Sequence, residues 1–216
     1  VANLTPLSVV ASHLVKVQGN DYDFVAKVTN PNPDYGSSDV EYEIEFYDAT
    51  GTALTSRTGS FYILPGQTKY IVEAPLSFSQ AVQRATLTVK RVAWQQLDPL
   101  AAAGISLLVR AADYGSATQP GAVGQVDGTI YNSSDYDLAQ TDLVILLFDG
   151  SSTIIGVNRT QIRTFLAKTT RAFSVAWFTP LTGAPQRTEA QVTTNVFENS
   201  NFLRQYQQPE RFQQYY

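Results

Sequence analysis

The second half of the chain repeats the first half at a spacing of about 102 residues, and this repeat limits the folds that the chain can adopt. Asn30 corresponds to Asn132, and Leu64 corresponds to Leu166. Further pairs keep the same order and spacing to within about two residues: Ile44–Asp48 with Ile145–Asp149, Thr68 with Thr170, Arg84–Val89 with Arg187–Val192, and Trp94 with Phe197. The 216 residues are therefore predicted to form two copies of one domain.

Each copy is predicted to consist of β-strands. Asp39–Phe46 alternates strictly, with Val40, Tyr42, Ile44 and Phe46 on one face and carboxylates on the other. Shorter strands are expected at Tyr22–Val28, which stops at Asn30–Pro33, and at Gln67–Ala74 and Gln83–Ala93. About six or seven strands are expected before residue 98.

The connections between these strands carry turn residues. Asp48–Gly51 is typical of a hairpin turn, and Leu64–Gln67 has the Pro and Gly positions of a type II turn. Turn signals every ~8–12 residues without a long helical periodicity favour an antiparallel β-sandwich. We therefore predict an all-β chain of two tandem immunoglobulin-like sandwiches, residues 1–98 and 99–200, followed by a tail at 201–216. Ala101–Gly104 is expected to connect them.

One motif resembles a known family. The run Ile44-x-Phe46-Tyr47-Asp48, with Gly51 after it and Leu64–Gln67 downstream, resembles the FxLYD domain, a small immunoglobulin-like β-sandwich of bacteria. Ile44 and Phe46 replace the Phe and Leu of that pattern, and the second copy reads Ile145-x-Leu147-Phe148-Asp149 with Ala167-Lys168 in place of Pro-Gly. The resemblance implies an exported lipoprotein or envelope protein. It provides no catalytic residues to assign.

Composition excludes several functions. Charged residues make up 16% of the chain and the net charge is −4, with no basic run, so a nucleic-acid partner is not expected. The absence of Cys excludes thiol nucleophiles, thiolate metal sites and disulfides. The single histidine, His13, lies in an apolar strand and is predicted to be structural or exposed rather than catalytic. We expect no enzyme activity and no cofactor.

The compartment is predicted from weaker signals. The chain starts at Val1 and contains no Met, which favours a mature exported protein with a processed N-terminus, located outside the cell or on its surface. A chosen chain boundary or simple removal of Met is the alternative. No run reaches the ~18 apolar residues of a membrane span.

Other patterns suggest sites less strongly. The carboxylates of Asp39, Glu41, Glu43 and Glu45 follow one strand face, which indicates a solvated face rather than a glycosidase pair. Asn20–Asp23 and Asp135–Asp137 could offer oxygen ligands to calcium, but turn hydrogen bonds are favoured. Asn3, Asn132 and Asn158 begin N-x-S/T triplets that could accept glycans, although we expect most of them to be unused.

The two copies differ most at one strand. The first copy has Glu41, Glu43 and Glu45 facing outward, whereas Leu143–Phe148 in the second copy is apolar on both faces and must be covered on both. The cover could come from the first domain, the connector or the tail, or from another subunit. Four residues are therefore predicted to make subunit or interdomain contacts: Leu143, Val144, Leu146 and Phe148.

The tail is the second predicted contact element. Residues 201–216 include five aromatic residues and five Gln, which suit a docked segment. Its predicted contact residues are Phe202, Leu203, Tyr206, Phe212, Tyr215 and Tyr216, with Val1–Leu7 as a weaker third element. The alternative is that both termini fold back on their own domains.

These patterns predict a non-enzymatic cell-surface protein that works through protein–protein contacts. It would be a structural or self-assembling subunit of an appendage, filament or envelope layer, with copies of itself or another envelope protein as partner. The alternative is an extracellular ligand- or glycan-binding module that uses Tyr22, Tyr35, Tyr114 and Tyr136 on loops. An enzyme is the third possibility, and it would need a pocket with a carboxylate pair of shifted titration.

Overall fold

The computed structural model describes residues 4–97 and 104–206, and these residues form twelve strands and one short helix. The first copy contains β1 (Ser8–Gln18), β2 (Asp21–Thr29), β3 (Tyr35–Tyr47), β4 (Ala53–Ile63), β5 (Thr68–Ser77) and β6 (Arg84–Gln96). The second contains β7 (Leu107–Gly115), β8 (Gly124–Asn132), β9 (Leu138–Phe148), β10 (Ile154–Phe165), β11 (Thr170–Trp177) and β12 (Arg187–Thr193), followed by α2 (Ser200–Tyr206). The predicted boundary at residue 98 lies outside the described residues.

Both copies have the same sheet topology. The first pairs its strands as β1-β2-β5 and β4-β3-β6, and the second pairs the corresponding strands as β7-β8-β11 and β10-β9-β12. Every pairing is antiparallel. The prediction of two tandem antiparallel β-sandwiches is therefore confirmed.

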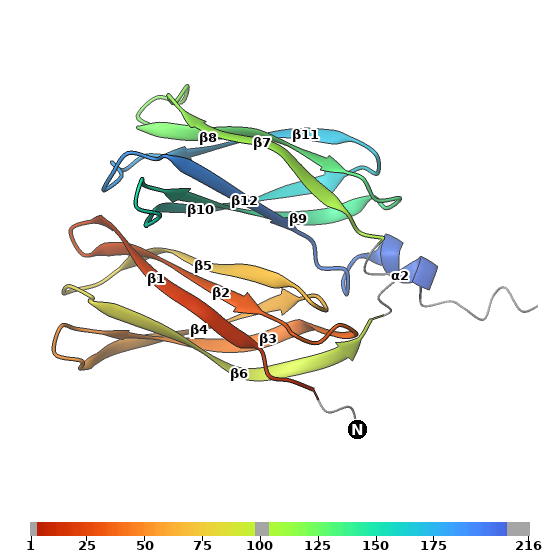
Figure 1. The fold of residues 1–216 in the computed structure, drawn as a ribbon, viewed down its shortest axis with the longest axis horizontal. Helices are drawn as coiled ribbons and strands as arrows, with labels where there is room; N and C mark the ends of the chain where they lie inside the picture. Colours follow the sequence, from red (N-terminus) through yellow and green to blue (C-terminus); the bar gives the residue numbers. More distant parts are fainter. Residues whose placement is uncertain (1–3, 98–103, 207–216) are drawn as a thin grey trace, which may run out of the picture.

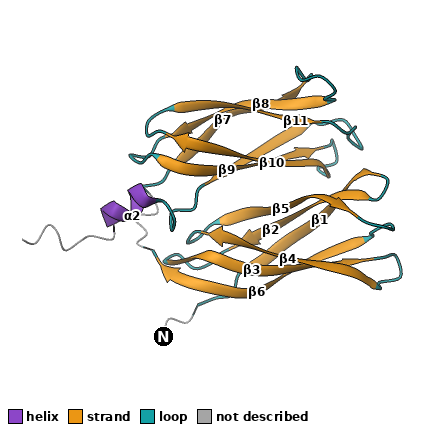
Figure 2. Cartoon of the chain, turned by 180° about the vertical axis from the view of Figure 1, so that it is seen from behind, coloured by secondary structure: helices purple, strands orange, loops and turns teal. Residues whose placement is uncertain are grey.

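The four sheets stack as parallel layers (Figures 1 and 2). From the first domain to the second, the order is β4-β3-β6, β1-β2-β5, β10-β9-β12 and β11-β8-β7. Three apolar clusters fill the three spaces between these layers, one inside each domain and one between the domains. The alternating residues of β3, namely Val40, Tyr42, Ile44 and Phe46, face the core of the first domain as predicted.

A buried asparagine recurs in each domain and explains the Asn30–Asn132 repeat. Neither side chain is exposed. Asn30 Nδ2 donates to the carbonyl oxygens of Tyr35 and Leu64 at 2.7 and 2.9 Å. Asn132 Nδ2 donates to the carbonyl oxygen of Tyr136 at 2.8 Å and to those of the Phe165–Leu166 segment. Each amide therefore links the loop after the second strand of its domain to the turn between the fourth and fifth strands.

The turns after β4 and β10 also correspond. Gly66 has φ +62°, and Gln67 N donates to Leu64 O at 3.2 Å, as the predicted turn requires. Lys168 takes the same role in the second copy with φ +56°. A lysine accepts this left-handed conformation at some cost, so the second copy keeps the turn without the Pro-Gly pair.

The outer face of β9 is covered by the first domain. Leu146, Phe148 and Val157 pack against the β1-β2-β5 sheet in a cluster between the domains. Its members from the first domain are Val15, Val25, Tyr70 and Val72. Leu146 is 1% exposed. The cover that the apolar strand demands is thus present within one chain.

Leu143 corrects one predicted contact. Its side chain is fully buried in the core of the second domain together with Ile145 and Leu147. Because successive strand residues point to opposite faces, only Val144, Leu146 and Phe148 face the first domain.

Side chains of the second domain also occupy the free edge of β5. Gln191 Oε1 accepts from Tyr70 N at 2.8 Å, and Gln191 Nε2 donates to Thr68 O at 2.9 Å. Arg159 Nη1 donates to Val72 O at 2.9 Å. Domain 2 therefore pairs backbone groups of an edge strand that would otherwise be open to another strand.

We expect Leu146→Glu to separate the two domains. The substitution places a carboxylate in the apolar layer at the position where the first copy has Glu45, and it should cost about 2–5 kcal/mol of unfolding free energy. Urea unfolding and the radius of gyration from X-ray scattering would measure the effect. Leu108→Glu is the matched control, because Leu108 is 49% exposed. Equal behaviour of the two variants would contradict the role given to this interface.

Candidate functional site

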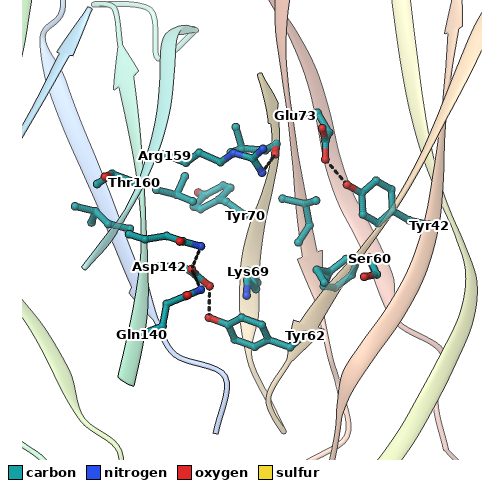
Figure 3. Close-up of a pocket in the computed structure, with 16 residues that line it drawn as sticks. Tyr42, Ser60, Tyr62, Lys69, Tyr70, Glu73, Gln140, Asp142, Arg159 and Thr160 are labelled. Atoms are coloured by element: carbon teal, nitrogen blue, oxygen red, sulfur yellow. Dashed lines mark hydrogen bonds between the residues drawn. The ribbon is translucent and has the colours of Figure 1, made fainter. Parts of the chain in front are cut away.

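A cleft lies where the two domains meet beside β4, β5, β9 and β10 (Figure 3). Its volume is about 590 Å³, which falls within the ~300–1,000 Å³ of small-molecule sites. Polar side chains from both domains line it, including Tyr62, Lys69, Glu73, Gln140, Asp142 and Arg159. The cleft begins where the apolar contact between the sheets ends, since Tyr70, Val72 and Val144 belong both to that contact and to the cleft wall.

Asp142 of β9 is held by donors on several strands. Tyr62 Oη donates to Asp142 Oδ2 at 2.8 Å and is 2.9 Å from Thr193 Oγ1. Gln140 Nε2 and Gln161 Nε2 donate to Asp142 Oδ1 at 3.3 and 3.2 Å. Three donors therefore fix this carboxylate and satisfy most of its acceptor capacity.

Lys69 of β5 is the least compensated charge of the cleft. Its side chain is 6% exposed, and Nζ lies 3.0 Å from the centroid of the Tyr62 ring. Within the described residues it makes no ion pair and donates no side-chain hydrogen bond. Burial lowers the pKa of Lys69 to about 7, and the charge of Asp142 opposes this shift.

The tyrosines of the cleft remain hydrogen-bond donors at neutral pH. Burial raises the pKa of Tyr62 and of Tyr42 far above the usual value, and it raises the pKa of Tyr70 to about 12. Tyr42 Oη donates to Glu73 Oε1 at 2.5 Å, and Tyr70 Oη donates to Glu189 Oε1 at 2.9 Å. The site is therefore a fixed array of hydrogen-bonding groups around one buried amine.

The chemistry of this array suits binding of a polar ligand. Its two carboxylates, Asp142 and Glu73, both accept hydrogen bonds from tyrosines, so neither resembles a free general base. In the described part of the chain, no group of three or more His, Cys, Asp or Glu side chains is placed to hold a metal ion. No helix among the described residues is long and apolar enough to cross a membrane.

The predicted contact residues other than Leu143 divide into three groups. Val144, Leu146 and Phe148 contact the first domain. Phe202 is 1% exposed and lies in the core of the second domain, with its ring 5.5 Å from Tyr136, and Leu203 packs against the same core. Tyr206 is the last residue of α2, but its side chain lies outside the described residues, as do Phe212, Tyr215 and Tyr216.

The N-terminal segment docks on its own domain. Thr5 N donates to Asn32 Oδ1 at 2.9 Å, and Asn32 Nδ2 donates to Thr5 O at 2.8 Å. Leu7 packs against the core of the first domain. Residues 1–3 lie outside the described part of the chain. Thr5 and Leu7 thus contact the first domain itself, which is the fold-back alternative for this terminus.

The four loop tyrosines do not form a binding platform, which corrects that part of the prediction. Tyr22 and Tyr136 are 4% and 6% exposed. The Tyr22 ring packs on Phe78, and the Tyr114 ring packs on Trp177 with centroids 6.2 Å apart. Tyr35 is only partly buried. The rings of Tyr22, Tyr114 and Tyr136 pack in or against the domain cores instead.

The remaining predicted positions lie away from the cleft. His13 is exposed. The carboxylate row on β3 makes surface ion pairs, with Arg91 between Asp39 and Glu41. The hydrogen bond from Arg91 holds the pKa of Glu41 below its usual value. This row is therefore a solvated, charge-paired face, as predicted.

Two of the three glycan triplets can be judged from the structure. Asn132 is fully buried and its amide is bonded to carbonyl oxygens, so it cannot accept a glycan in the folded chain. Asn158 is partly buried, and its Nδ2 donates to Ala176 O at 3.0 Å. Asn3 lies outside the described residues.

Sequence reasoning missed Lys69, Tyr62, Arg159 and Gln191. A signal existed in the repeat, because Tyr70 and Val72 correspond at a spacing of 102 to Ala172 and Ser174. At these positions β5 is apolar, whereas β11 has small or polar residues. The difference indicates that this face of β5 is covered by another part of the protein.

The comparisons with known proteins identify no family. No family model matches the chain, and no curated protein matches it in sequence. Among solved structures, a red sea bream transglutaminase is similar over 89% of this chain and 30% of that chain, at 12% sequence identity and a TM-score of 0.29. The chain therefore spans less than a third of that protein, and the TM-score is too low to support an argument about function.

We expect Lys69→Met to stabilise the protein, most strongly at low pH. The pKa of Lys69 is about 7 in the folded protein and 10.5 ordinarily, so the unfolded chain binds more protons between these values. Wild-type stability should therefore rise with pH across that window, while the full cost of the buried cation remains below pH 7. The variant should be more stable by about 1 kcal/mol or more at pH 6.

Urea unfolding at pH 6, 8 and 9.5 would measure this difference. The advantage of Lys69→Met should shrink as the pH approaches 10, and Lys16→Met, at an exposed lysine of β1, is the matched control. A constant difference between Lys69→Met and wild type at all three pH values would contradict the assigned environment.

Proposed function

We propose that this chain is a non-enzymatic, exported cell-surface protein that works by binding a partner molecule in the cleft between its two domains. The observation that carries the proposal is the cleft itself, in which hydrogen-bonding side chains of both domains surround the buried Lys69 amine. The surface location rests on the resemblance to FxLYD domains.

The proposal is supported by the rigidity of the cleft walls. Strands rather than flexible loops carry Lys69, Asp142 and Arg159. Hydrogen bonds between the domains and an apolar layer fix one wall relative to the other. A binding site whose groups are held before the ligand arrives loses less conformational entropy on binding.

Stacking of further copies through the sheet faces is disfavoured by the chemistry of the two outermost sheets. The outer face of β3 has Glu43 and Glu45 where β9 has Val144 and Leu146. On β8, exposed Asp127 corresponds to buried Val25 of β2. Among the described residues, two apolar outer faces of the sandwiches meet only between the two domains of one chain. This contact supports a two-domain unit rather than a stack of many copies joined face to face.

Ser60→Trp tests the proposal by filling the cleft. Ser60 is exposed on β4 at the cleft wall, and an indole there should weaken binding of a cleft ligand at least tenfold while leaving the fold intact. Ser56→Trp is the matched control, because Ser56 is an exposed residue of the same strand outside the cleft. A screen of small polar ligands by NMR chemical-shift mapping would provide the readout.

The expected shifts cluster on β5, β9 and β10, and they should disappear only in the Ser60→Trp variant. Ligands that shift other surfaces, or that bind both variants equally, would contradict a function of the cleft. A screen in which no compound shifts the cleft amides would count against the proposal as well.

Self-assembly is the second candidate function, with copies of the chain or another envelope protein as partner. The composition of the tail favours it, since Phe212, Tyr215 and Tyr216 would present aromatic side chains to a neighbouring subunit. Phe202 and Leu203 are already used in the core of the second domain. The contact would therefore depend on residues beyond Tyr206.

Removal of residues 207–216 should abolish assembly if this second candidate is correct. Light scattering would give the mass of the native particle for the full chain and for a chain ending at Tyr206, which keeps Phe202 in place. A full-length chain with Phe212, Tyr215 and Tyr216 each replaced by Ser is the control for tail length. A full chain with the mass of one subunit would exclude self-assembly through the tail.

A further inference from the structure

We propose that the cleft recognises a carboxylate on a hydroxyl-rich ligand, such as an acidic sugar, and that Lys69 binds the carboxylate. This inference rests on the proposed function and specifies the chemical class of the ligand.

Lys69 is a largely buried cation without an ion-pair partner among the described residues. The residue is 6% exposed, and the Tyr62 ring lies against its amine, but no described carboxylate lies within ion-pair distance. A desolvated charge normally has a hydrogen-bonded partner, because burial without one is costly. Asp142 does not fill this role, since Tyr62, Gln140 and Gln161 already donate to it.

The burial of Lys69 is specific to the cleft rather than a property of the fold. The corresponding residue of the second domain is Arg171, which is exposed and donates to Thr164 O at 2.8 Å. Both residues occupy the second position of the fifth strand of their domain. Only the first copy places its cation in a cavity.

The groups around Lys69 suit hydroxyls. Gln140 and Gln161 are exposed, and because their Nε2 atoms donate to Asp142, their carbonyl oxygens remain available to accept from ligand hydroxyl groups. Ser60 and Thr160 add hydroxyl groups that can donate or accept. Apolar surface from Phe61 and Val144 lines the same cavity and could contact the C–H face of a sugar ring.

The charge balance favours a single carboxylate over a phosphate. Lys69 and Arg159 are cationic, whereas Asp142 and Glu73 are anionic, so the ionisable lining is neutral overall when Lys69 is protonated. A dianionic phosphate would add two negative charges near two carboxylates. A monoanion on an uncharged body compensates Lys69 with less of this repulsion.

The test compares three probes on the full chain: galacturonic acid, galactose and inorganic phosphate. Titrations followed by NMR shifts of the amides of β5, β9 and β10 would give the affinities. We expect galacturonic acid to bind at the cleft at least tenfold more tightly than galactose or phosphate. In Lys69→Met, galacturonic acid should lose at least tenfold in affinity and bind no better than galactose. Arg171→Met, at the exposed counterpart, should bind like wild type.

Several results would overturn the inference. Equal cleft binding of galactose and galacturonic acid, or unchanged binding in Lys69→Met, would remove the role of Lys69 while leaving the cleft as a binding site. Tighter binding of phosphate than of galacturonic acid would show that the cleft prefers another anion to a carboxylate. If none of the three probes binds in the cleft, the inference is also overturned. The wider ligand screen with the Ser60→Trp variant would then decide the proposed function separately.

Discussion

The apolar contact between the β1-β2-β5 and β10-β9-β12 sheets is the interaction on which the rest of the structure depends. Each domain has its own core, but this third cluster converts two small sandwiches into one four-layer body. Leu146, Phe148 and Val157 would be exposed on an isolated second domain, where such a face would favour aggregation. The contact also brings Gln191 and Arg159 to the free edge of β5. This one contact between sheets therefore covers both an apolar sheet face and an open strand edge.

The cleft follows from this arrangement. Tyr70, Val72 and Val144 belong to the apolar layer and also line the cleft, next to polar side chains of both domains. The hydrogen bond from Tyr62 to Asp142 joins the two domains at the cleft. A buried Lys69 is tolerated there because the interface as a whole stabilises the geometry that buries it. Such local costs are common at functional sites.

Much of the fold could be predicted from the sequence, because strand alternation and turn residues are local signals. The repeat of Asn30 at Asn132 reflects a buried amide that makes corresponding hydrogen bonds in both domains. The apolar run at Leu143–Phe148 predicted a covered face but left the identity of the cover open. The hydrophobic effect is non-directional, so it does not specify which apolar surface provides the cover. Lys69 could not be recognised as buried, because the sequence does not record which strand edge another domain will close.

The divergence of the repeats gives the two copies different sheet faces. A face-to-face contact between unlike sheet faces is heterologous, and such a contact could in principle continue from copy to copy. Here the fitted faces occur once: Val25 and Tyr70 of the first copy are replaced in the second by Asp127 and Ala172, while Glu45 of the first copy replaces Leu146. The unused faces therefore carry charged or small residues at the positions that would have to be apolar. Differences at a few strand positions therefore restrict the apolar contact to one pair of faces, and the cleft that contains Lys69 lies beside that contact.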